Sequence, residues 1–282
     1  MKRKIGLLLI LSLAFCTSGV LAAGLPAYGA DEGVIIYEVN SGDILFQQKQ
    51  NEKFYPASTT KLMTALVAIE HGDLNENFTV GEEIESLDAD SSTAGLEVEE
   101  VISLNELLYA LLLPSGNDAA ETIAVNIGRK IAGDSSISAE KAYEAFVAAM
   151  NKKAKEMGMT GTSFTNPHGL HNDKHYTTAA DMLILAKTAF EDSTIKAITR
   201  GKVHEVQTNK TKHKWYNSNL LLYSNFNELS EDYRVANNLS GTNSAFNGYA
   251  ASGQTGYTAA PNTCPALDAA AIGARPQQTG LE

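Results

Sequence analysis

The feature that most constrains the fold is a helix-forming segment, 56–69, that is apolar around most of its circumference. Pro56 suits the start of a helix, and Gly72 is a common stop signal. Its apolar side chains are too many for a single stripe: Leu62, Met63, Ala65, Leu66, Val67, Ala68 and Ile69. A helix that is apolar all round is normally buried. The rest of the chain must therefore wrap this segment, which becomes the central helix of a packed domain.

Strand-like segments lie on both sides of a helical middle. β-Branched and aromatic runs at 34–39 and 44–46 surround a turn with a glycine, which predicts an antiparallel hairpin. Alternation at 202–208 predicts a second hairpin, with its tip at 210–214. Apolar periodicity predicts further helices at 104–113, 118–131, 139–157 and 178–190. This order of elements indicates an α+β fold.

Charge and cysteine content exclude several classes of protein. The chain has 22 Lys and Arg against 33 Asp and Glu, a net charge of −11, which argues against binding to nucleic acid or to an anionic membrane surface. The two cysteines, Cys16 and Cys264, cannot form a disulfide framework or a cysteine-rich zinc site. A hydrophobic content of 44% is that of a folded domain.

The first 30 residues have the pattern of a secretory signal peptide. Lys2, Arg3 and Lys4 precede an apolar run at 5–15, and small residues continue to Ala30. The apolar run is shorter than the ~20 residues that a membrane-spanning helix needs. We therefore expect cleavage to release an exported protein, secreted or associated with the cell envelope, that keeps no transmembrane span.

The sharpest chemical feature is the pair Ser58 and Lys61 at the start of the central helix. Residues i and i+3 share a helix face, so the hydroxyl and the amine are expected to be neighbours. The lysine can take the serine proton only if burial or nearby positive charge lowers its pKa. Taken alone, such a short pattern is more often a capping serine followed by a solvated lysine.

Further strings change that interpretation. Residues 114–120 supply Ser115 and Asn117 at a helix–loop–helix junction, and 166–170 reads Asn-Pro-His-Gly-Leu. The string at 175–179 reads His-Tyr-Thr-Thr-Ala and is followed by Asp181. Together, and in this order, these strings resemble those of the serine penicillin-recognising enzymes, in particular the D-alanyl-D-alanine carboxypeptidase branch. The resemblance extends over about 34–222.

The resemblance implies a β-lactamase/DD-peptidase-like α+β fold, in which an antiparallel sheet from the chain ends packs against a helical subdomain. It implies an acyl-transfer enzyme that acts on peptidoglycan stem peptides ending in D-Ala-D-Ala. Such an enzyme would be inhibited covalently by β-lactams and would take part in cell-wall synthesis and the maintenance of cell shape. Ser58 would be the nucleophile, Lys61 the general base and Ser115 a proton relay. Asn117 would orient the base and hold a substrate amide. Neither a metal nor a cofactor is needed.

The third signature of that family, Lys-Thr-Gly, is altered here. The similar string is 253–258, where Gln254 replaces the lysine that meets the substrate carboxylate. Thr255 and Gly256 would remain beside that carboxylate, and the Tyr257 N–H would complete the oxyanion hole. We therefore keep open a second hypothesis, a catalytically impaired relative that binds penicillin or peptidoglycan as a module. An extra deacylating glutamate is not evident between Asn117 and Gln254, so a peptidase is preferred over a class A β-lactamase.

The predicted peptidase domain covers 31–258, and 259–282 forms a short, atypical tail with three prolines. We expect either an incomplete sheet or a chain that is truncated or altered relative to longer members of the family.

Other clusters have simpler explanations. The histidines at 168, 171 and 175 invite a zinc site or a Ser-His-Asp hydrolase, but they lie in a loop, and a nucleophile-elbow motif is lacking. The acidic runs at 82–85 and 97–100 are expected to be solvated surface rather than a calcium site. Trp215 and its aromatic neighbours Tyr216, Tyr223 and Phe226 are expected to pack in the core or at its rim rather than line a glycan groove.

Overall fold

We describe the protein from a computed structural model, which covers residues 32–89, 91–223, 225–231, 234 and 272–274. The predicted N-terminal hairpin is confirmed: β1 (Gly33–Tyr37) pairs antiparallel with β2 (Ile44–Gln48). On its other side β1 pairs antiparallel with β7 (Ile272–Ala274), which gives the strand order β2-β1-β7. Strands from the two ends of the chain therefore share one sheet.

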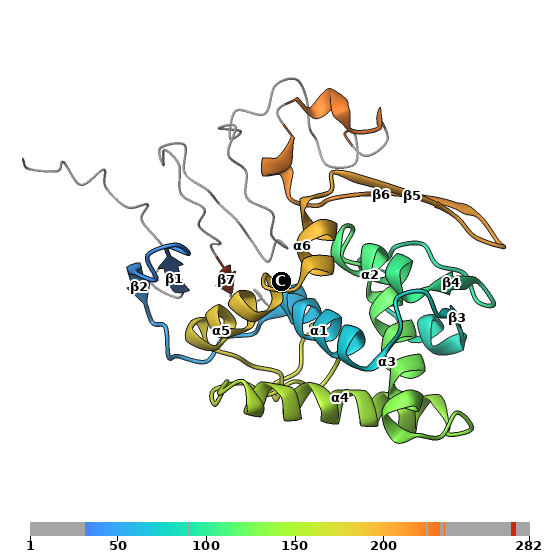
Figure 1. The fold of residues 1–282 in the computed structure, drawn as a ribbon, viewed down its shortest axis with the longest axis horizontal. Coiled ribbons are helices and arrows are strands. Elements are labelled where there is room, and N and C mark those ends of the chain that lie inside the picture. The colour runs from blue at the N-terminus through green and yellow to red at the C-terminus, as the bar shows by residue number, and fades with distance from the viewer. Residues whose placement is uncertain (1–31, 90, 224, 232–233, 235–271, 275–282) are drawn as a thin grey trace, which may run out of the picture.

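The central helix is buried as predicted, and its first turn is tighter than a regular α-helix. Residues Ala57–Thr60 form a 3₁₀ turn, η1, and α1 follows at Lys61–His71. Every residue from 61 to 68 is buried, and Met63, Ala65 and Ala68 have no exposed surface. Each large apolar side chain of this kind stabilises the fold by about 1.5–3 kcal/mol. Figure 1 shows α1 in the middle of the helical body.

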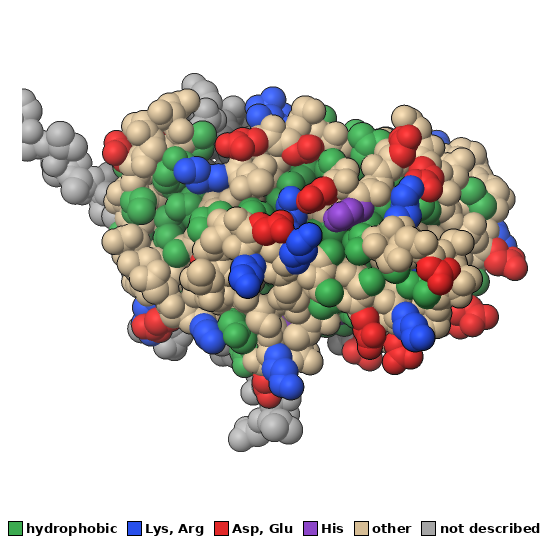
Figure 2. All heavy atoms as spheres, turned by 60° about the horizontal axis from the view of Figure 1, so that its bottom comes forward, with side chains coloured by type: hydrophobic (Ala, Val, Ile, Leu, Met, Phe, Trp, Pro, Cys, Tyr) green, Lys and Arg blue, Asp and Glu red, His purple; other side chains and the backbone are tan. Residues whose placement is uncertain are grey.

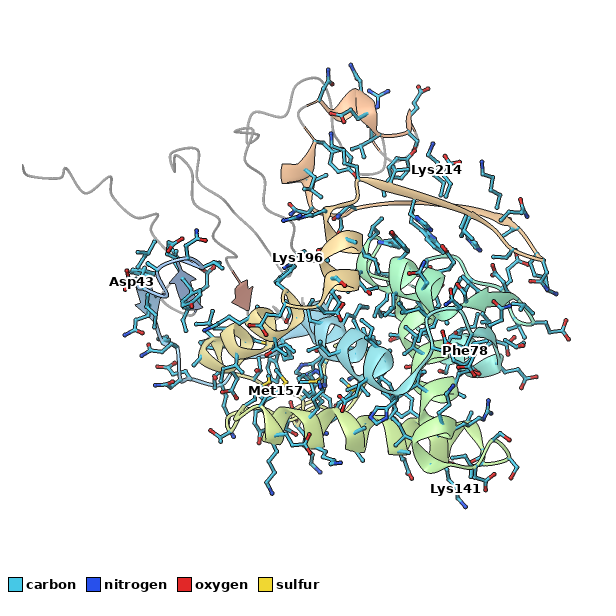
Figure 3. All side chains as sticks on the ribbon, in the orientation of Figure 1. Asp43, Phe78, Lys141, Met157, Lys196 and Lys214 are labelled. Atoms are coloured by element: carbon cyan, nitrogen blue, oxygen red, sulfur yellow. The ribbon has the colours of Figure 1, made fainter. Side chains whose placement is uncertain are left out.

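The predicted helices around α1 are all present. They are α2 (Leu104–Leu112), α3 (Asn117–Ala132), α4 (Ala139–Glu156) and α5 (Ala179–Ala189). Polar side chains fix where three of them begin: Ser103, Ser138 and Thr178 accept hydrogen bonds from backbone N–H groups in the first turns. α3 ends at Gly133, whose left-handed φ of 68° suits a glycine. The side chains drawn in Figure 3 fill the space between these helices.

Several short elements were not predicted, four of them within the first 200 residues. They are β3 (Asn77–Thr79), which pairs with β4 (Val101–Ser103), the 3₁₀ turn η2 (Glu82–Ser86) and α6 (Ser193–Arg200). Asp192 caps α6 through the N–H groups of Thr194 and Ile195. β3, β4 and η2 are too short to show a hydrophobic period, so their sequences carry almost no local signal. α6 does carry one, because Asp192 is a good N-cap residue and the buried Ile195 and Ile198 are three positions apart, and the prediction missed it.

A second hairpin projects from the helical body, as predicted, but its tip lies elsewhere (Figure 1). β5 (Val203–Gln207) pairs with β6 (Lys212–Tyr216), so the connection is 208–211 and Lys212–Lys214 belong to a strand. Two further 3₁₀ turns follow, η3 (Leu220–Leu222) and η4 (Phe226–Glu228). The hairpin adds a polar, charged ribbon to the otherwise helical side of the molecule.

The hairpin docks through buried side chains. Trp215 is 4% exposed and its Nε1–H donates to the Ala94 carbonyl over 2.8 Å, so the packing interpretation of this tryptophan is confirmed. The prediction that 97–100 is solvated is wrong for Glu100, which has no exposed surface and pairs with His213 Nε2 at 2.6 Å. A buried carboxylate needs such a partner.

One face of the molecule carries charged side chains of both signs (Figure 2). Acidic and basic side chains lie beside one another on the face drawn in Figure 2. Among the described residues, the helices are too short or too polar to span a membrane. The predicted signal peptide, 1–30, and both cysteines lie outside the described residues, as does the tail at 259–282 apart from β7.

Candidate active site

The 3₁₀ turn η1 brings Ser58 and Lys61 together. Lys61 Nζ lies 3.2 Å from Ser58 Oγ. Because side chains at i and i+3 are eclipsed in a 3₁₀ turn, this local geometry aligns them more directly than an α-helix would. The turn is entered through Ala57, a non-glycine residue with φ of +48°. Strained backbone of this kind gathers at functional sites.

Lys61 is the most unusual group of the site. Its side chain is fully buried, yet Nζ contacts only neutral oxygens: Ser58 Oγ, Asn117 Oδ1 at 2.7 Å and the His168 carbonyl at 2.9 Å. Burial without a paired carboxylate lowers the pKa of Lys61 to about 7, while the negative charge of Asp118 opposes this shift. A substantial fraction of this amine is therefore neutral near pH 7 and able to accept a proton.

Asn117 comes to Lys61 from the start of α3. Its backbone N–H donates to the Ser92 carbonyl at 2.8 Å, and its Nδ2 donates to Ser91 Oγ at 3.3 Å. The amide oxygen is thereby turned toward Lys61 and the amide NH₂ toward the segment 91–92. One side chain thus connects the base to the polar loop that precedes β4.

Asp118 holds that loop in place. Its buried carboxylate accepts from the N–H groups of Ala94 and Leu96, at distances of 2.8 to 3.0 Å, and from its own neighbour Ala119. Hydrogen bonds to a charged group are stronger than neutral ones. The same carboxylate is the nearby negative charge that keeps the pKa of Lys61 from falling further.

Ser115 lies in the connection between α2 and α3, two residues before Asn117. Its φ is +64°, an uncommon conformation for a residue with a side chain. Its Oγ is buried and has no hydrogen-bond partner among the described residues. A buried hydroxyl without a partner costs free energy, so packing alone does not account for this side chain.

The loop 164–171 closes the site from the other side. Thr64 Oγ1 donates to the Pro167 carbonyl at 2.5 Å, and Asn166 accepts from Gly169 N–H at 2.6 Å. Gly169 has φ of +93°, and a Cβ built there would lie 1.8 Å from the Ala57 carbonyl oxygen and 3.0 Å from Ser58 N. Only glycine lets this loop approach the nucleophile turn so closely.

His175, which follows this loop, serves as a hydrogen-bonding residue. His175 Nδ1 accepts from Thr165 N–H at 3.0 Å, so its Nε2–H donates to Thr60 Oγ1 at 2.8 Å. Burial lowers the pKa of His175 to about 4. Among the described residues no cluster of His, Cys, Asp or Glu could hold a metal ion.

Glu121 is a site residue that the sequence analysis did not identify. It is one turn after Asn117 on α3, and its Oε1 lies 2.9 Å from Nε2 of His168. The available signal was the i, i+4 spacing from Asn117, which places both side chains on one helix face. The predicted substrate-binding residues Gln254, Thr255, Gly256 and Tyr257 lie outside the described residues.

A serine hydroxyl beside a buried lysine with a lowered pKa, at the start of a central helix, is the kind of site that serine acyl-transfer enzymes use. The sequence of this chain matches the D-alanyl-D-alanine carboxypeptidase family over residues 22–230, and the protein belongs to that family. The resemblance stated from the motifs is therefore confirmed.

Individual relatives agree with this assignment. The chain is 34% identical over 201 residues to the D-alanyl-D-alanine carboxypeptidase DacF of Bacillus subtilis, covering 70% of this chain and 48% of that protein. It is 30% identical over 230 residues to the D-alanyl-D-alanine carboxypeptidase of Streptomyces sp. strain K15, covering 74% of this chain and 76% of that protein. The chain spans about half the length, or less, of several of the curated relatives it matches.

The fold agrees as well. The crystal structure of the Streptomyces K15 DD-transpeptidase superposes with a TM-score of 0.63 at 26% identity, covering 71% of this chain and 78% of that one. The predicted α+β, DD-peptidase-like fold class is thereby confirmed.

Proposed function

We propose that this protein is a serine D-Ala-D-Ala carboxypeptidase that acts on peptidoglycan stem peptides through a Ser58 acyl-enzyme and releases D-alanine. One observation carries the proposal: the fully buried Lys61 amine, with its pKa lowered to about 7, lies 3.2 Å from Ser58 Oγ. That arrangement is what an unactivated serine needs in order to become a nucleophile near neutral pH.

Acylation follows from these positions. Neutral Lys61 takes the Ser58 hydroxyl proton while Oγ attacks the carbonyl carbon between the two D-alanines. The resulting oxyanion is stabilised by the Ser58 N–H and, from the family resemblance, by the Tyr257 N–H, each donor contributing about 3 kcal/mol to the lowering of the barrier. The C–N bond then breaks, and protonated Lys61 passes its proton through Ser115 to the leaving amine, which makes Lys61 neutral again. The buried, unpaired Oγ of Ser115 supports this relay role.

Deacylation returns the enzyme to its starting state. Water gives a proton to neutral Lys61 as it attacks the Ser58 ester, and the ester C–O bond breaks. Ser58 recovers its proton from Lys61, and the shortened peptide leaves with a free carboxylate. Asn117 serves both steps by keeping its amide oxygen on Lys61, while its amide NH₂ is available to a substrate carbonyl.

The proposed substrate sets further expectations. β-Lactams, which share the reactive amide and the adjacent carboxylate, should acylate Ser58 and inhibit the protein. Gln254, Thr255 and Gly256 would hold the substrate's terminal carboxylate through neutral hydrogen bonds. The pattern of the first 30 residues supports export to the cell envelope, where this substrate is found.

Covalent labelling with a fluorescent penicillin tests the proposal. Wild type should label stoichiometrically, with the adduct located on the peptide that contains Ser58 by mass spectrometry, and Ser58→Ala should not label. Equal labelling of wild type and Ser58→Ala, or no labelling of a folded wild-type sample, contradicts the nucleophile assignment. D-Alanine release from a D-Ala-D-Ala peptide tests the hydrolytic step separately.

A binding module is the second candidate, and Gln254 is the observation that favours it. Under this alternative the wild type binds penicillin but turns over a D-Ala-D-Ala peptide far more slowly than Gln254→Lys does. Comparable turnover by the two proteins rules the alternative out.

A further inference from the structure

We infer that the buried pair Glu121–His168 is a positioning element for Lys61, which holds the His168 carbonyl as the acceptor that aims the lysine lone pair at Ser58. This inference rests on the proposed function, because it assigns Glu121 and His168 a part in the same acylation step. Neither side chain touches Ser58, so both act through Lys61.

The two hydrogen-bond acceptors of Lys61 set the direction of its lone pair. A neutral lysine has two N–H bonds and one lone pair. Asn117 Oδ1, at 2.7 Å, and the His168 carbonyl, at 2.9 Å, accept from the two N–H bonds. The lone pair is then directed at Ser58 Oγ, 3.2 Å away. If either acceptor is lost, the amine can rotate and the lone pair is no longer held on the serine.

The position of the His168 carbonyl depends on how the rest of His168 is held. This carbonyl belongs to a loop, whereas Asn117 is anchored in α3. The His168 ring is restrained on both sides: Nδ1 accepts from Leu170 N–H at 3.1 Å, so Nε2 carries the proton and donates to Glu121 Oε1 at 2.9 Å. The two side chains are only 7% and 9% exposed. The ring therefore ties the residue that supplies the carbonyl to α3.

One helix, α3, supplies both residues that support the position of Lys61, Asn117 directly and Glu121 through His168. Asn117 and Glu121 are separated by one turn of α3, so they lie on the same face, and a single rigid element sets both acceptors of Lys61. The burial of a carboxylate here has an electrostatic effect as well, because Glu121 contributes, after burial itself, to raising the pKa of Tyr143 on α4.

Acylation kinetics of the full chain with a fluorescent penicillin test the inference. Glu121→Leu removes the acceptor, and we expect the acylation rate constant to fall at least about tenfold while the affinity of the preceding non-covalent complex is unchanged, because misdirection of a reacting group affects the chemical step. Glu121→Gln keeps an acceptor oxygen for Nε2–H and should retain most of the rate. This rescue separates the hydrogen bond from the negative charge.

A matched control is available in the second hairpin. Glu100 is also buried and paired with a histidine, His213, at 2.6 Å, but it contacts the β5–β6 hairpin rather than the loop at 164–171. Lys214, the neighbour of His213, is labelled on this hairpin in Figure 3, well away from α4. Glu100→Leu should lower the free energy of unfolding as Glu121→Leu does, without slowing acylation.

A second variant protects the test against misfolding. Glu121→Leu combined with His168→Phe removes both members of the pair at once, so that neither a buried carboxylate nor a buried imidazole N–H is left unpaired, and only the half-buried Leu170 N–H loses its acceptor. The double change is therefore tolerated better than the single change. We expect this double variant to fold and still to acylate slowly. A wild-type acylation rate in the double variant, or in folded Glu121→Leu, would overturn the inference. So would acylation that is slowed equally in Glu121→Leu and Glu121→Gln, or slowed as much in Glu100→Leu as in Glu121→Leu. Absence of labelling in the wild type would instead refute the proposed function.

Discussion

At the scale of single residues, the chemistry depends on one lysine that is buried without a carboxylate. The desolvation cost of Lys61 is what lowers its pKa to about 7, and three neutral oxygens satisfy its hydrogen bonds without restoring that pKa. The residue thus combines full burial with availability as a base. A carboxylate in place of the Asn117 amide would stabilise the ammonium form and remove the base.

The acylation rate should follow the titration of Lys61. Because only the neutral amine can accept the Ser58 proton, the rate rises with pH and levels off above about 7, the pKa of Lys61. Below that value it falls about tenfold per pH unit. Stopped-flow acylation by penicillin between pH 5 and 9 measures this profile. A rate that is constant from pH 5 to 7 would show that Lys61 is not the base.

Gly169 is expected to be irreplaceable. In Gly169→Ala the new Cβ would lie 1.8 Å from the Ala57 carbonyl oxygen, so the loop must withdraw from the nucleophile turn. We expect a loss of about 2–4 kcal/mol in the free energy of unfolding together with loss of acylation. Urea unfolding and penicillin labelling measure the two effects.

Gly158→Ala provides the control for Gly169→Ala. Gly158 has φ of +84°, but nothing lies within 4 Å of its added Cβ. It should show only the cost of a left-handed alanine, about 1 kcal/mol, with labelling intact. If the two variants lost equal stability and both kept their labelling, the close approach of Gly169 to Ala57 would have no effect on function.

At the scale of elements, the start of α3 organises the site. Within two turns this helix supplies Asn117 to Lys61, Asp118 to the segment 94–96, and Glu121 to His168. Most of α1 to α5 was predictable because each helix repeats an apolar period over many residues. The strands β3 and β4 could not be predicted, because their pairing with each other rather than a local pattern determines them. α6 was missed although its cap Asp192 and its apolar residues Ile195 and Ile198 are a local signal.

Asp118→Asn tests this organisation. An amide offers one acceptor oxygen where the carboxylate offers two, so some N–H groups of 94–96 lose their partner, and we expect the protein to be destabilised by about 2–4 kcal/mol. Because Asp118 raises the pKa of Lys61, its neutralisation should also move the acylation profile to lower pH. Asp134→Asn, which changes an exposed aspartate after α3, should do neither. If the pH dependence of acylation were the same in Asp118→Asn as in the wild type, the electrostatic role of Asp118 would be contradicted.

At the scale of the whole molecule, the burial of neutral histidine links global stability to pH. The pKa of His175 is lowered from 6.5 to about 4 in the folded state, so between these values the unfolded chain binds a proton that the folded protein does not. The free energy of unfolding should therefore fall by about 3 kcal/mol as the pH drops from 7 to 4. Denaturant titrations at a series of pH values measure this loss.

A substitution isolates the contribution of His175. His175→Gln keeps a donor and an acceptor for Thr60 and Thr165 without a titrating ring, so its stability should decline less between pH 7 and 4 than that of the wild type. His171→Gln, at a residue 41% exposed, should follow the wild-type curve. Identical pH dependence in wild type and His175→Gln would show that other groups carry the acid sensitivity.

Local patterns in the amino-acid sequence are enough to predict the central apolar helix, its principal helical neighbours and the pairing of Ser58 with Lys61, because these depend on contacts between residues close in the chain. The sequence motifs also indicated Ser115 and Asn117 through family resemblance. The burial of Lys61, its hydrogen bonds to the His168 carbonyl and Asn117, and the pairing of Glu121 and Glu100 with histidines are known from the three-dimensional structure alone. The physical reason is that desolvation and long-range hydrogen bonds depend on which distant segments come together, and a local pattern does not contain that information.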